Sequence, residues 1–594
     1  MLDKKSLDRQ ITTRRTFIIG AGKLGLLFLL AGRMFYMQFI KKDEYRTLSD
    51  NNRIKMILLT PKRGKILDKN GEIIAKNNTC FRLMIDKNNN SDFQQEIDYL
   101  ATILELDSEQ VSEVQKRVQK SGKRVAAIII DFLEWAQVAI IEERRDHFKA
   151  LFIDTGFERF YSKGPATAHF TGYLGRPTSE DGDQIKLADE TFKVGKSGVE
   201  KSYENYLRGE FGFKRIEVNA LGKYVRELGK NSSIPGNDLS LNIDLEIQER
   251  AYYHLNQLGS SAIVMDCESG NVIVCASAPS FDPNKFNKLS NKYWNELIND
   301  PYKPLIDKTI KSLYPPGSVF KLITLIAALE SGISPENRVI CTGWSSFLGG
   351  NNFRCARSKG HGAINLMDAI KYSCNTYMFT IAKQIGAKKI IDVAKKFGFD
   401  SLTEVDLPGE LSGFVPTEEW KKEKQGTKWS LGDTLNLSIG QGFLLTTPMQ
   451  LARFITTIAS GGKLFTPRIS SALHSRYSYV HIDPSHLEII RTTLYNTLNT
   501  QGGTGYLSRV DYKSIEMAGK TGTAQVRAKK NAADDLSRDN IAWESRNHAI
   551  FAGFAPFDKP KYSICVYFDH GGGGGRAAAP IAKKIMLDVL SKYM

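Results

Sequence analysis

The chain has 594 residues and a formal net charge of +16, with 42% hydrophobic and 25% charged residues. This composition is typical of a folded protein and excludes disorder as the default, and the length is enough for more than one domain. A basic balance is compatible with nucleic acid or with an anionic membrane surface. The basic residues are scattered and no nucleic-acid motif accompanies them, so we expect no nucleic-acid partner.

The first forty residues are typical of a membrane anchor. Phe17–Ile40 is largely apolar and long enough to cross hydrocarbon, although Lys23 and Arg33 interrupt it. Five basic residues precede it, opposed by two aspartates: Lys4, Lys5, Arg9, Arg14 and Arg15. This bias predicts a cytoplasmic tail at 1–16, a membrane helix at 17–40 and the remainder outside the membrane. A cleaved signal peptide is the alternative, but Ala31-Gly32-Arg33 is a poor cleavage site.

Residues 41–235 mix strand-like and helical stretches and carry no catalytic set. The predicted elements are strands at Ile54–Leu59 and Cys80–Ile85 and helices at Phe93–Leu104 and Val111–Val118. We interpret this region as a pedestal that lifts a catalytic domain off the membrane. Asn231–Asn237 is the predicted linker. The catalytic domain is predicted at 238–594, beginning with a strand at Leu239–Ile243 and a helix at Leu245–Leu258.

A serine and a lysine three residues apart form the first candidate catalytic pair. Ser318 follows Tyr314-Pro315-Pro316-Gly317, a strong stop before an apolar helical pattern. It is therefore expected near a helix N-terminus, where free N–H groups favour a developing anion. Lys321 lies one turn away on the same face, and burial should lower its pKa so that it accepts the serine proton. A serine and a surface lysine on an ordinary helix are the alternative.

A second candidate pair is Ser373 and Asn375, expected in a loop between two helices. The serine hydroxyl can relay a proton between Lys321 and a leaving amine, and the carboxamide can bind a substrate amide. Ser373 and Asn375 are equally common in polar turns without any catalytic role. The presence of the other two motifs favours a catalytic role for this pair over a polar turn.

The third motif, Lys520-Thr521-Gly522-Thr523, reads as a strand of small residues. Small side chains let a substrate lie along a sheet edge. Lys520 and Thr521 are predicted to hold a carboxylate, and the backbone N–H groups of Thr523 and Ser318 to form an oxyanion hole. Each motif is weak alone, but the three in this order are typical of acyl-serine enzymes that act on an amide next to a carboxylate.

The chain resembles class B penicillin-binding proteins, and most of all those of the cell-elongation machinery. The matching stretches of the C-terminal half are Ser280–Asn284, Tyr314–Lys321, Gly440–Gly442, Thr447–Leu451, and His570–Gly575 continuing to Ala579–Ile581. Those nearer the N-terminus are Asn52–Ile54, Arg63–Asp68, Gly195–Glu200 and Tyr203–Glu204. The resemblance covers nearly the whole chain beyond the first few dozen residues. One departure is Val319, where many relatives carry threonine.

The resemblance implies an α+β fold, with an antiparallel sheet flanked by helices as the transpeptidase domain and an elongated pedestal before it. It also implies a peptidoglycan D,D-transpeptidase. Ser318 would attack the penultimate carbonyl of a stem peptide ending in D-Ala-D-Ala, and an amine from a neighbouring stem would resolve the acyl-enzyme. Thr521, Gly522 and Thr523 would bind substrate, and β-lactams would trap the same serine.

Other acyl-serine proteins remain as alternatives. A β-lactamase needs a base that activates water for deacylation, and no second carboxylate motif is evident. A β-lactam sensor usually has several membrane segments, whereas this sequence shows one. A D,D-carboxypeptidase uses water as the acceptor, and a division-type transpeptidase is the nearest relative. Tyr314–Gly317 and the glycine run after His570 favour the elongation type.

The cysteines contain a candidate metal site. Three of the seven lie near one histidine: Cys341, Cys355, His361 and Cys374. Three thiolates and an imidazole make a complete tetrahedral set for structural zinc, although the spacing is not the short Cys-x-x-Cys type. Glycines flank His361 and would let its loop approach an ion. A Cys341–Cys355 disulfide, the usual expectation outside the cytoplasm, and free buried thiols are the alternatives.

The resemblance adds to the metal hypothesis and supplies the expected partners. Some elongation-type relatives have a zinc site whose His and Cys match His361 and Cys374, with aspartates where this chain has Cys341 and Cys355. No organic cofactor is expected. The implied partners are peptidoglycan stem peptides, β-lactams and a membrane glycosyltransferase of the elongation machinery, for which Lys23 is a candidate contact. The implied location is the inner membrane, with the catalytic domain in the periplasm.

Overall fold

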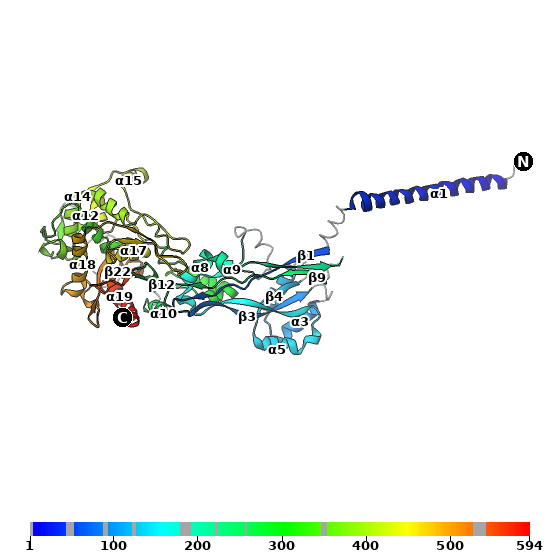
Figure 1. Cartoon of the computed structure of the whole chain (residues 1–594), viewed down its shortest axis with the longest axis horizontal. Helices are drawn as coiled ribbons and strands as arrows, with labels where there is room; N and C mark the ends of the chain where they lie inside the picture. Colours follow the sequence, from blue (N-terminus) through cyan, green and yellow to red (C-terminus); the bar gives the residue numbers. More distant parts are fainter. Residues whose placement is uncertain are drawn as a thin grey trace.

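The structure, a computed structural model, places the N-terminal helix, the pedestal and the catalytic domain in a line (Figure 1). It describes residues 4–42, 53–86, 93–120, 126–178, 192–219, 224–255, 258–345, 353–526 and 542–594. Residues 1–3 of the predicted tail, residues 43–52 at the start of the predicted pedestal and several loops lie outside these ranges. The arrangement agrees with the predicted α+β fold.

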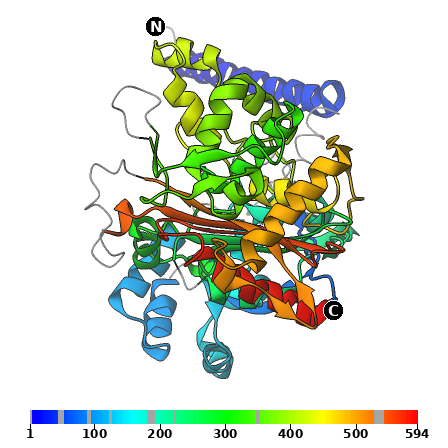
Figure 2. The ribbon, with the colours of Figure 1, turned by 90° about the vertical axis from the view of Figure 1, so that its left-hand side faces the viewer.

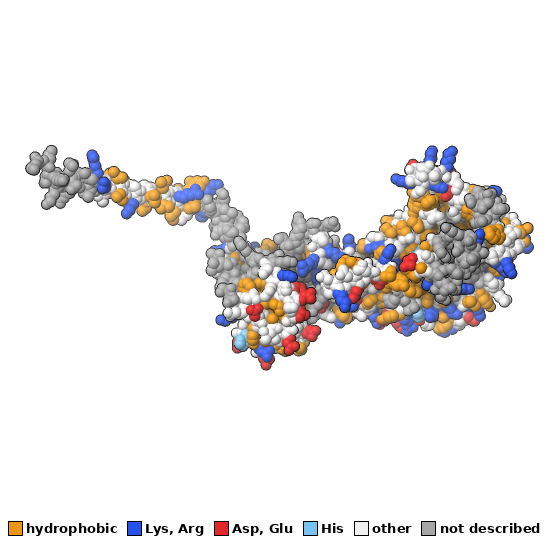
Figure 3. Space-filling view, turned by 180° about the vertical axis from the view of Figure 1, so that it is seen from behind, with side chains coloured by type: hydrophobic (Ala, Val, Ile, Leu, Met, Phe, Trp, Pro, Cys, Tyr) orange, Lys and Arg blue, Asp and Glu red, His pale blue; other side chains and the backbone are white. Residues whose placement is uncertain are grey.

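The N-terminal helix α1 spans Lys4–Phe35 and continues as a π-helical turn, Tyr36–Ile40. Within the described residues, Arg14–Ile40 is the one helical stretch long and apolar enough to cross a membrane, and no part of it is buried against the protein. Hydrophobic side chains cover it, with Lys and Arg towards both ends (Figure 3). The helix fits a single-pass membrane anchor, as the sequence predicts.

Two sheets form the pedestal. The first is antiparallel in the order β1-β8-β9: Ile54–Leu59, Gly212–Val218 and Tyr224–Asn231. The second has the order β10-β2-β3-β4, with β5 on β3: Leu239–Ser240, Ile66–Leu67, Ile73–Asp86, Ala126–Leu133 and Leu151–Tyr161. Helices α3, α4 and α5 flank it: Phe93–Ile103, Ser108–Lys120 and Trp135–Glu143. Leu83, Ile97 and Ile129 belong to the apolar core between these elements.

A buried ion cluster joins the pedestal segments. Glu200 lies in the short helix α8 (Gly198–Ser202) and is fully buried. Its two carboxylate oxygens accept hydrogen bonds of 2.7 Å from Arg63, which precedes β2, and from Arg159 on β5. Burial alone would raise the pKa of Glu200, but the two guanidinium groups hold it below its ordinary value.

The remaining pedestal elements are short. They are the helices α6 (Ala168–Thr171) and α9 (Glu204–Arg208), the strand pair β6 and β7 (Leu174–Gly175 and Val194–Gly195) and the 3-10 turns Arg145–His147 and Gly164–Ala166. The 3-10 segment Pro283–Lys288 of the catalytic domain packs against β5.

A five-stranded antiparallel sheet forms the centre of the catalytic domain. Its order is β12-β11-β23-β22-β21: Val272–Ala278, Ser260–Asp266, Tyr562–Phe568, His548–Ala555 and Ala518–Ala524. Along β11, Ala262 and Val264 face one apolar core, whereas Ile263 and Met265 face another. This alternation explains why the strand is buried on both faces.

Helices cover both faces of this sheet (Figure 2). On one face lie α10 and α19, at Leu245–His254 and Ala578–Tyr593. On the other lies α17 (Pro448–Ala459), followed outwards by α12, α14 and α16, at Lys321–Glu330, Asn375–Lys396 and Leu431–Ser438. Helix α18 (Pro484–Asn499) packs beside β21. Helices α11, α13 and α15 span Asn291–Asn299, Leu366–Lys371 and Glu418–Gln425.

Small strand pairs complete the domain. They are β13–β16 (Val339–Cys341 with Gly362–Ile364), β14–β15 (Trp344–Ser345 with Phe353–Arg354), β17–β18 (Lys463–Phe465 with Tyr477–Tyr479) and β19–β20 (Asp511–Tyr512 with Ile515–Glu516).

Most predicted elements are present with small shifts in their ends. The predicted strand at Leu239–Ile243 is shortened to β10, which pairs in parallel with β2 of the pedestal. The predicted boundary at 238 therefore falls one residue before a strand that belongs to the pedestal sheet. Leu241 then bridges to Ser470 of the catalytic domain, so the chain crosses between the domains as extended backbone rather than as a flexible linker.

Candidate active site and metal centre

Ser318 lies in a single 3-10 turn, Gly317–Val319, immediately before helix α12. Gly317 has φ of +53°, and a Cβ there would lie 2.8 Å from the backbone oxygen of Thr523. Glycine is thus needed for the turn to approach strand β21. The preceding Tyr314 stacks on Tyr567 of β23, with ring centroids 3.9 Å apart. These contacts hold the candidate nucleophile against the central sheet.

Lys321, the first residue of α12, is completely buried. Its Nζ donates hydrogen bonds to the backbone oxygen of Ser373 at 2.7 Å, to Ser373 Oγ at 3.2 Å and to Asn375 Oδ1 at 2.6 Å. No carboxylate pairs with it among the described residues, and burial lowers the pKa of Lys321 to about 8. About a tenth of this amine is therefore neutral at pH 7, far more than for an ordinary lysine, and a proton acceptor must be neutral.

Ser373 lies in the turn between α13 and α14, as the sequence predicts, with φ of +55°. Positive φ is uncommon outside glycine and points the serine towards Lys321 instead of continuing the helix. Asn375 begins α14, and its side-chain amide donates a hydrogen bond of 3.0 Å to the backbone oxygen of Arg354. Both side chains of this motif are thus oriented by contacts with segments distant in the sequence.

Lys520 lies on β21, which is the edge strand of the central sheet. Its Nζ donates to the backbone oxygen of Thr521 at 3.0 Å. Burial, together with the charge of Lys321, lowers the pKa of Lys520 well below its ordinary value. An incoming carboxylate would restore the charged form, because an opposite charge stabilises it. The free edge of β21 leaves backbone groups for an extended peptide.

Three residues at the site lie outside the three catalytic motifs, although Gln441 and Gly574 belong to stretches that resemble the family. Thr504, on the loop after α18, accepts a hydrogen bond of 2.7 Å from Thr521 Oγ1. Gln441 donates to the backbone oxygen of Thr523 at 3.4 Å, and the N–H of Gly574 donates to Thr523 Oγ1 at 3.2 Å. The Gly571–Gly575 run thus packs on β21, where a Cβ at 574 would lie 2.2 Å from the oxygen of Gly522.

The three motifs therefore lie together: the turn of Ser318 packs on strand β21, and the Lys321 amine next to that turn is hydrogen-bonded to Ser373 and Asn375. No hydrogen bond joins Ser318 to Lys321 in the described part of the site. Catalytic hydrogen bonds are often long without substrate and tighten when it binds.

The predicted metal ligands Cys341, Cys355, His361 and Cys374 also come together, with all four ligand atoms within 4.8 Å of one another. His361 Nδ1 lies 3.5 Å from the sulfurs of Cys341 and Cys355, and the sulfurs of Cys355 and Cys374 are 3.7 Å apart. All seven cysteines of the structure are free thiols, and Cys341–Cys355 is not a disulfide in it.

The loop around His361 is built for this approach. Gly360 has φ of +73°, and a Cβ there would lie 2.1 Å from the oxygen of Cys341. The His361 N–H donates to the same oxygen at 3.0 Å. Cys374 caps helix α14 and accepts the Tyr377 N–H at 3.4 Å, so its sulfur points away from the Ser373 hydroxyl.

A serine at a tight turn, a buried lysine without a counter-ion and an open edge strand together define a class of acyl-transfer enzyme. Comparison with known protein families shows which family of acyl-transfer enzymes this is. Residues 260–587 match the penicillin-binding protein transpeptidase domain, and residues 58–241 match the penicillin-binding protein dimerisation domain. The chain belongs to the penicillin-binding protein transpeptidase family.

Relatives and solved structures support a narrower assignment. The peptidoglycan D,D-transpeptidase MrdA of Haemophilus influenzae is 31% identical over 98% of this chain and 92% of its own. PBP2 of Helicobacter pylori, solved in complex with MreC, has a TM-score of 0.81 and 29% identity, covering 91% of this chain and 99% of that chain. A structure of a peptidoglycan synthase complex, solved in a study of how polymerization and crosslinking are coordinated, has a TM-score of 0.69 and 26% identity. The match covers 96% of this chain and 98% of that chain.

These findings confirm the family and function that the sequence resemblance predicts. The chain is an elongation-type peptidoglycan D,D-transpeptidase, and the division-type alternative is not favoured.

Proposed function

We propose that the transpeptidation proceeds through an ester of Ser318. The observation that carries the proposal is the convergence of Lys321, Ser373 and Asn375 beside the Ser318 turn, with hydrogen bonds of 2.6–3.2 Å around one uncompensated amine. The neutral Lys321 amine takes the proton from Ser318 as its oxygen attacks the penultimate carbonyl of a stem peptide ending in D-Ala-D-Ala.

The oxyanion of this step is stabilised by the backbone N–H groups of Ser318 and Thr523, which the Gly317 turn brings together. Lys520 and Thr521 hold the terminal carboxylate of the donor, and Asn375 binds an amide of its backbone. The Ser373 hydroxyl relays the proton from Lys321 to the departing nitrogen. The C–N bond breaks, and terminal D-alanine leaves with an uncharged amino group. The rest of the stem peptide remains as an ester on Ser318.

In the second half-reaction an amine from a neighbouring stem attacks the ester carbonyl. A new amide bond forms as the ester C–O bond to Ser318 Oγ breaks, the attacking amine loses one proton to Lys321, and Lys321 returns a proton to Ser318 Oγ. Water in place of the amine gives hydrolysis, which is D,D-carboxypeptidase activity. Single-turnover partitioning of a pre-formed acyl-enzyme between water and amine acceptors distinguishes the two. Release of free acid alone, with every amine tested, would contradict transpeptidation.

We further propose that Cys341, Cys355, His361 and Cys374 hold a structural zinc ion. With Zn–S near 2.3 Å and Zn–N near 2.0 Å, a tetrahedron requires S···N edges of about 3.5 Å and S···S edges of about 3.8 Å. The observed 3.5, 3.5 and 3.7 Å fit these edges. Four protein ligands leave no open coordination position. The ion would cross-link the Ser373–Asn375 turn to the β13–β16 hairpin.

The zinc proposal is tested by elemental analysis of untagged protein, with one zinc per chain expected. Cys355→Ser should lower zinc content, thermal stability and acylation rate together. Cys565→Ser, which changes a buried cysteine of β23 outside the cluster, should leave zinc content unchanged. Metal-free protein that keeps full stability and full acylation would contradict the proposal.

For partners and orientation, we propose an inner-membrane location with a cytoplasmic N-terminus and a periplasmic catalytic domain. The basic residues before Arg14–Ile40 support the orientation. The complexes of the structural relatives support a MreC-like partner and a membrane glycosyltransferase. Co-purification from membranes tests the pairing, and Lys23→Leu should weaken it if Lys23 contacts a partner helix. Unchanged recovery of the variant complex would exclude that contact.

A further inference from the structure

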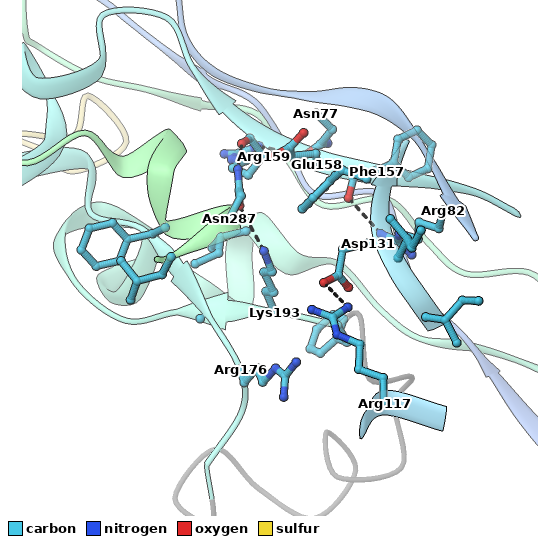
Figure 4. Close-up of a pocket in the computed structure, with 18 of the residues that line it drawn as sticks. Asn77, Arg82, Arg117, Asp131, Phe157, Glu158, Arg159, Arg176, Lys193 and Asn287 are labelled. Atoms are coloured by element: carbon cyan, nitrogen blue, oxygen red, sulfur yellow. Dashed lines mark hydrogen bonds and ion pairs between the residues drawn. The ribbon is translucent and has the colours of Figure 1, made fainter. Parts of the chain in front are cut away.

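A cavity of about 860 Å³ is lined mainly by residues of the pedestal, which lies apart from helices α12 and α14 of the catalytic domain (Figure 1). It opens between helix α4, strands β3 to β5, the β6–β7 pair and the segment Pro283–Lys288 (Figure 4). Several of the side chains that line it are basic: Arg63, Arg82, Arg117, Arg159, Arg176, Lys193 and Arg208. None of them belongs to the catalytic or cysteine sites.

Some of these cations have acidic partners and some do not. Arg117 pairs with Asp131 at 2.6 Å across the cavity wall. Arg82 donates to the backbone oxygen of Phe157 at 3.2 Å and also contacts the Cys80 sulfur, and Lys193 donates to the side-chain oxygen of Asn287 at 3.1 Å, so neither contact is with a carboxylate. Arg176, at the mouth, has no partner among the described residues. Three cations thus face the cavity without a salt bridge in the described part of the pedestal.

Burial makes this arrangement costly. Burial lowers the pKa of Lys193 below its ordinary value, even though Asp131 and Glu158 attract it. Arg159 is 4% exposed, and its Nη2 has no hydrogen-bond partner. The Nε of Arg208 is also buried and unpartnered. Buried donors without a protein acceptor are rare in native proteins, so these two guanidinium groups have donors left to offer a ligand or water.

The backbone also accommodates the cations. Gly156 of β5 lies opposite Cys80 of β3, and a Cβ there would lie 2.2 Å from the guanidinium carbon of Arg82. Glycine at this position lets Arg82 lie flat across the strand towards the cavity. Phe132, Phe157 and Phe286 line the same cavity and supply apolar surface between the charges.

We propose that this cavity binds the carboxylates of peptidoglycan stem peptides, on a part of the strand other than the one at Ser318. Guanidinium groups match carboxylates in geometry, and apolar rings suit the sugar faces between them. The pedestal lies between the N-terminal helix and the catalytic domain (Figure 1), so a glycan strand that extends from the membrane to the catalytic domain would pass along it. The identity of the polymer rests on the transpeptidase function.

The test measures binding with the catalytic serine blocked. Full-length protein in detergent is acylated to completion with a β-lactam, and four probes are then compared. They are uncross-linked glycan strands with stem peptides, the same strands stripped of peptides by an amidase, a poly-glutamate peptide and inorganic phosphate. Intact strands should bind, and stripped strands should not.

Variants locate the site. The double variant Arg176→Ala, Lys193→Gln should weaken binding of intact strands at least about tenfold. Lys116→Ala removes an exposed lysine of the same helix as Arg117 but outside the cavity, and should bind as the unmodified protein does. Arg176→Ala alone changes an exposed side chain and should give a smaller loss if the double variant folds poorly.

Several outcomes would overturn the proposal. These are equal binding of stripped and intact strands, tighter binding of poly-glutamate, which would indicate an acidic protein segment, and equal binding of phosphate, which would indicate a non-specific anion site. An unaffected double variant would also exclude the cavity. The β-lactam acylation rate of each variant should match the unmodified protein, so failure of binding is distinguished from failure of the catalytic assignment.

Discussion

The Glu200 cluster of the pedestal and the catalytic site both bury charged side chains, but the cluster neutralises its charges whereas the two buried lysines of the site have no counter-ion among the described residues. In the pedestal, Glu200 is held by Arg63 and Arg159 at 2.7 Å. Burial alone would lower the pKa of Arg63, but Glu200 and Glu204 raise it above its ordinary value. In the catalytic domain, Lys321 and Lys520 are equally buried and contact only neutral oxygens.

This difference separates a structural use of charge from a chemical one. A buried cation with its counter-ion is locked in the charged form and fixes the segments it joins. A buried amine without one becomes easier to deprotonate, which is what a general base requires. The pedestal cluster therefore should matter for folding, and the catalytic lysines for reaction rate.

The largest expected effect is on catalysis. Lys321→Met removes the proposed base but keeps the side-chain length, and the acylation rate with a β-lactam should fall at least about 10³-fold. The free energy of unfolding should change little or increase, because an uncompensated buried amine is lost. Stopped-flow kinetics measures the acylation rate, and chemical denaturation measures the free energy of unfolding. Lys388→Ala, at an exposed site of α14, is the control. Near-normal acylation by Lys321→Met would require a different base.

The opposite pattern is expected in the pedestal. Glu200→Gln leaves the buried guanidinium group of Arg159 without a counter-ion among the described residues and leaves Arg63 with Glu204 alone, and the free energy of unfolding should fall by about 3 kcal/mol or more. The acylation rate of the folded protein should change less than about threefold. Because the pKa of Glu200 is lowered in the folded protein, its contribution exists above the ordinary glutamate pKa and is lost as pH falls.

Glu109→Gln, at an exposed position of α4, is the matched control for the pedestal and should be neutral. A Glu200→Gln protein as stable as the control would show that the cluster does not hold the pedestal together.

The pH dependence of acylation sharpens the distinction. Since the pKa of Lys321 is lowered to about 8, the neutral amine increases as pH rises towards that value. The acylation rate constant should therefore rise about tenfold per pH unit well below 8 and level off above it. A pH series of β-lactam acylation under saturating conditions gives the profile. A rate that falls between pH 6 and pH 8 would contradict a lysine base.

The smallest expected effect concerns a contact beside the motifs. Thr504→Ala removes the acceptor of the Thr521 hydroxyl, and acylation should slow by about three- to tenfold. Thr504→Ser keeps a hydroxyl and should restore most of the rate. Equal rates in all three proteins would show that the Thr521–Thr504 contact does not position the carboxylate-binding residues.

Much of the catalytic domain could be predicted from the sequence because its chemistry resides in short motifs. The Pro-Pro-Gly stop before Ser318 predicts the start of a helix, and the small residues of β21 predict a strand, so each motif indicates its own local structure. Thr504, Gln441 and Gly574 could not be predicted in the same way. Each reaches the site from a distant segment, and a threonine, glutamine or glycine by itself indicates no role.

In the pedestal, even more of the structure depends on contacts between segments that are distant in the sequence. Glu200 belongs to a stretch that resembles the family, but the sequence does not say that Arg63 and Arg159 meet it. Strand β10 lies just after the predicted boundary at 238 yet belongs to the pedestal sheet, because its pairing with β2 joins segments more than 170 residues apart, as Leu239 with Ile66 shows. The unpaired cations around the pedestal cavity are likewise visible only after folding, since each sits alone in the sequence.

The central claim is that Ser318 is the acylated residue and that the buried amine beside it is its base. Mass spectrometry of the peptides of a β-lactam adduct tests it most directly. The account predicts a single covalent label on the peptide that contains Ser318, and no label on that peptide in Ser318→Ala protein. A label on any other peptide, or an undiminished label in the Ser318→Ala variant, would contradict it.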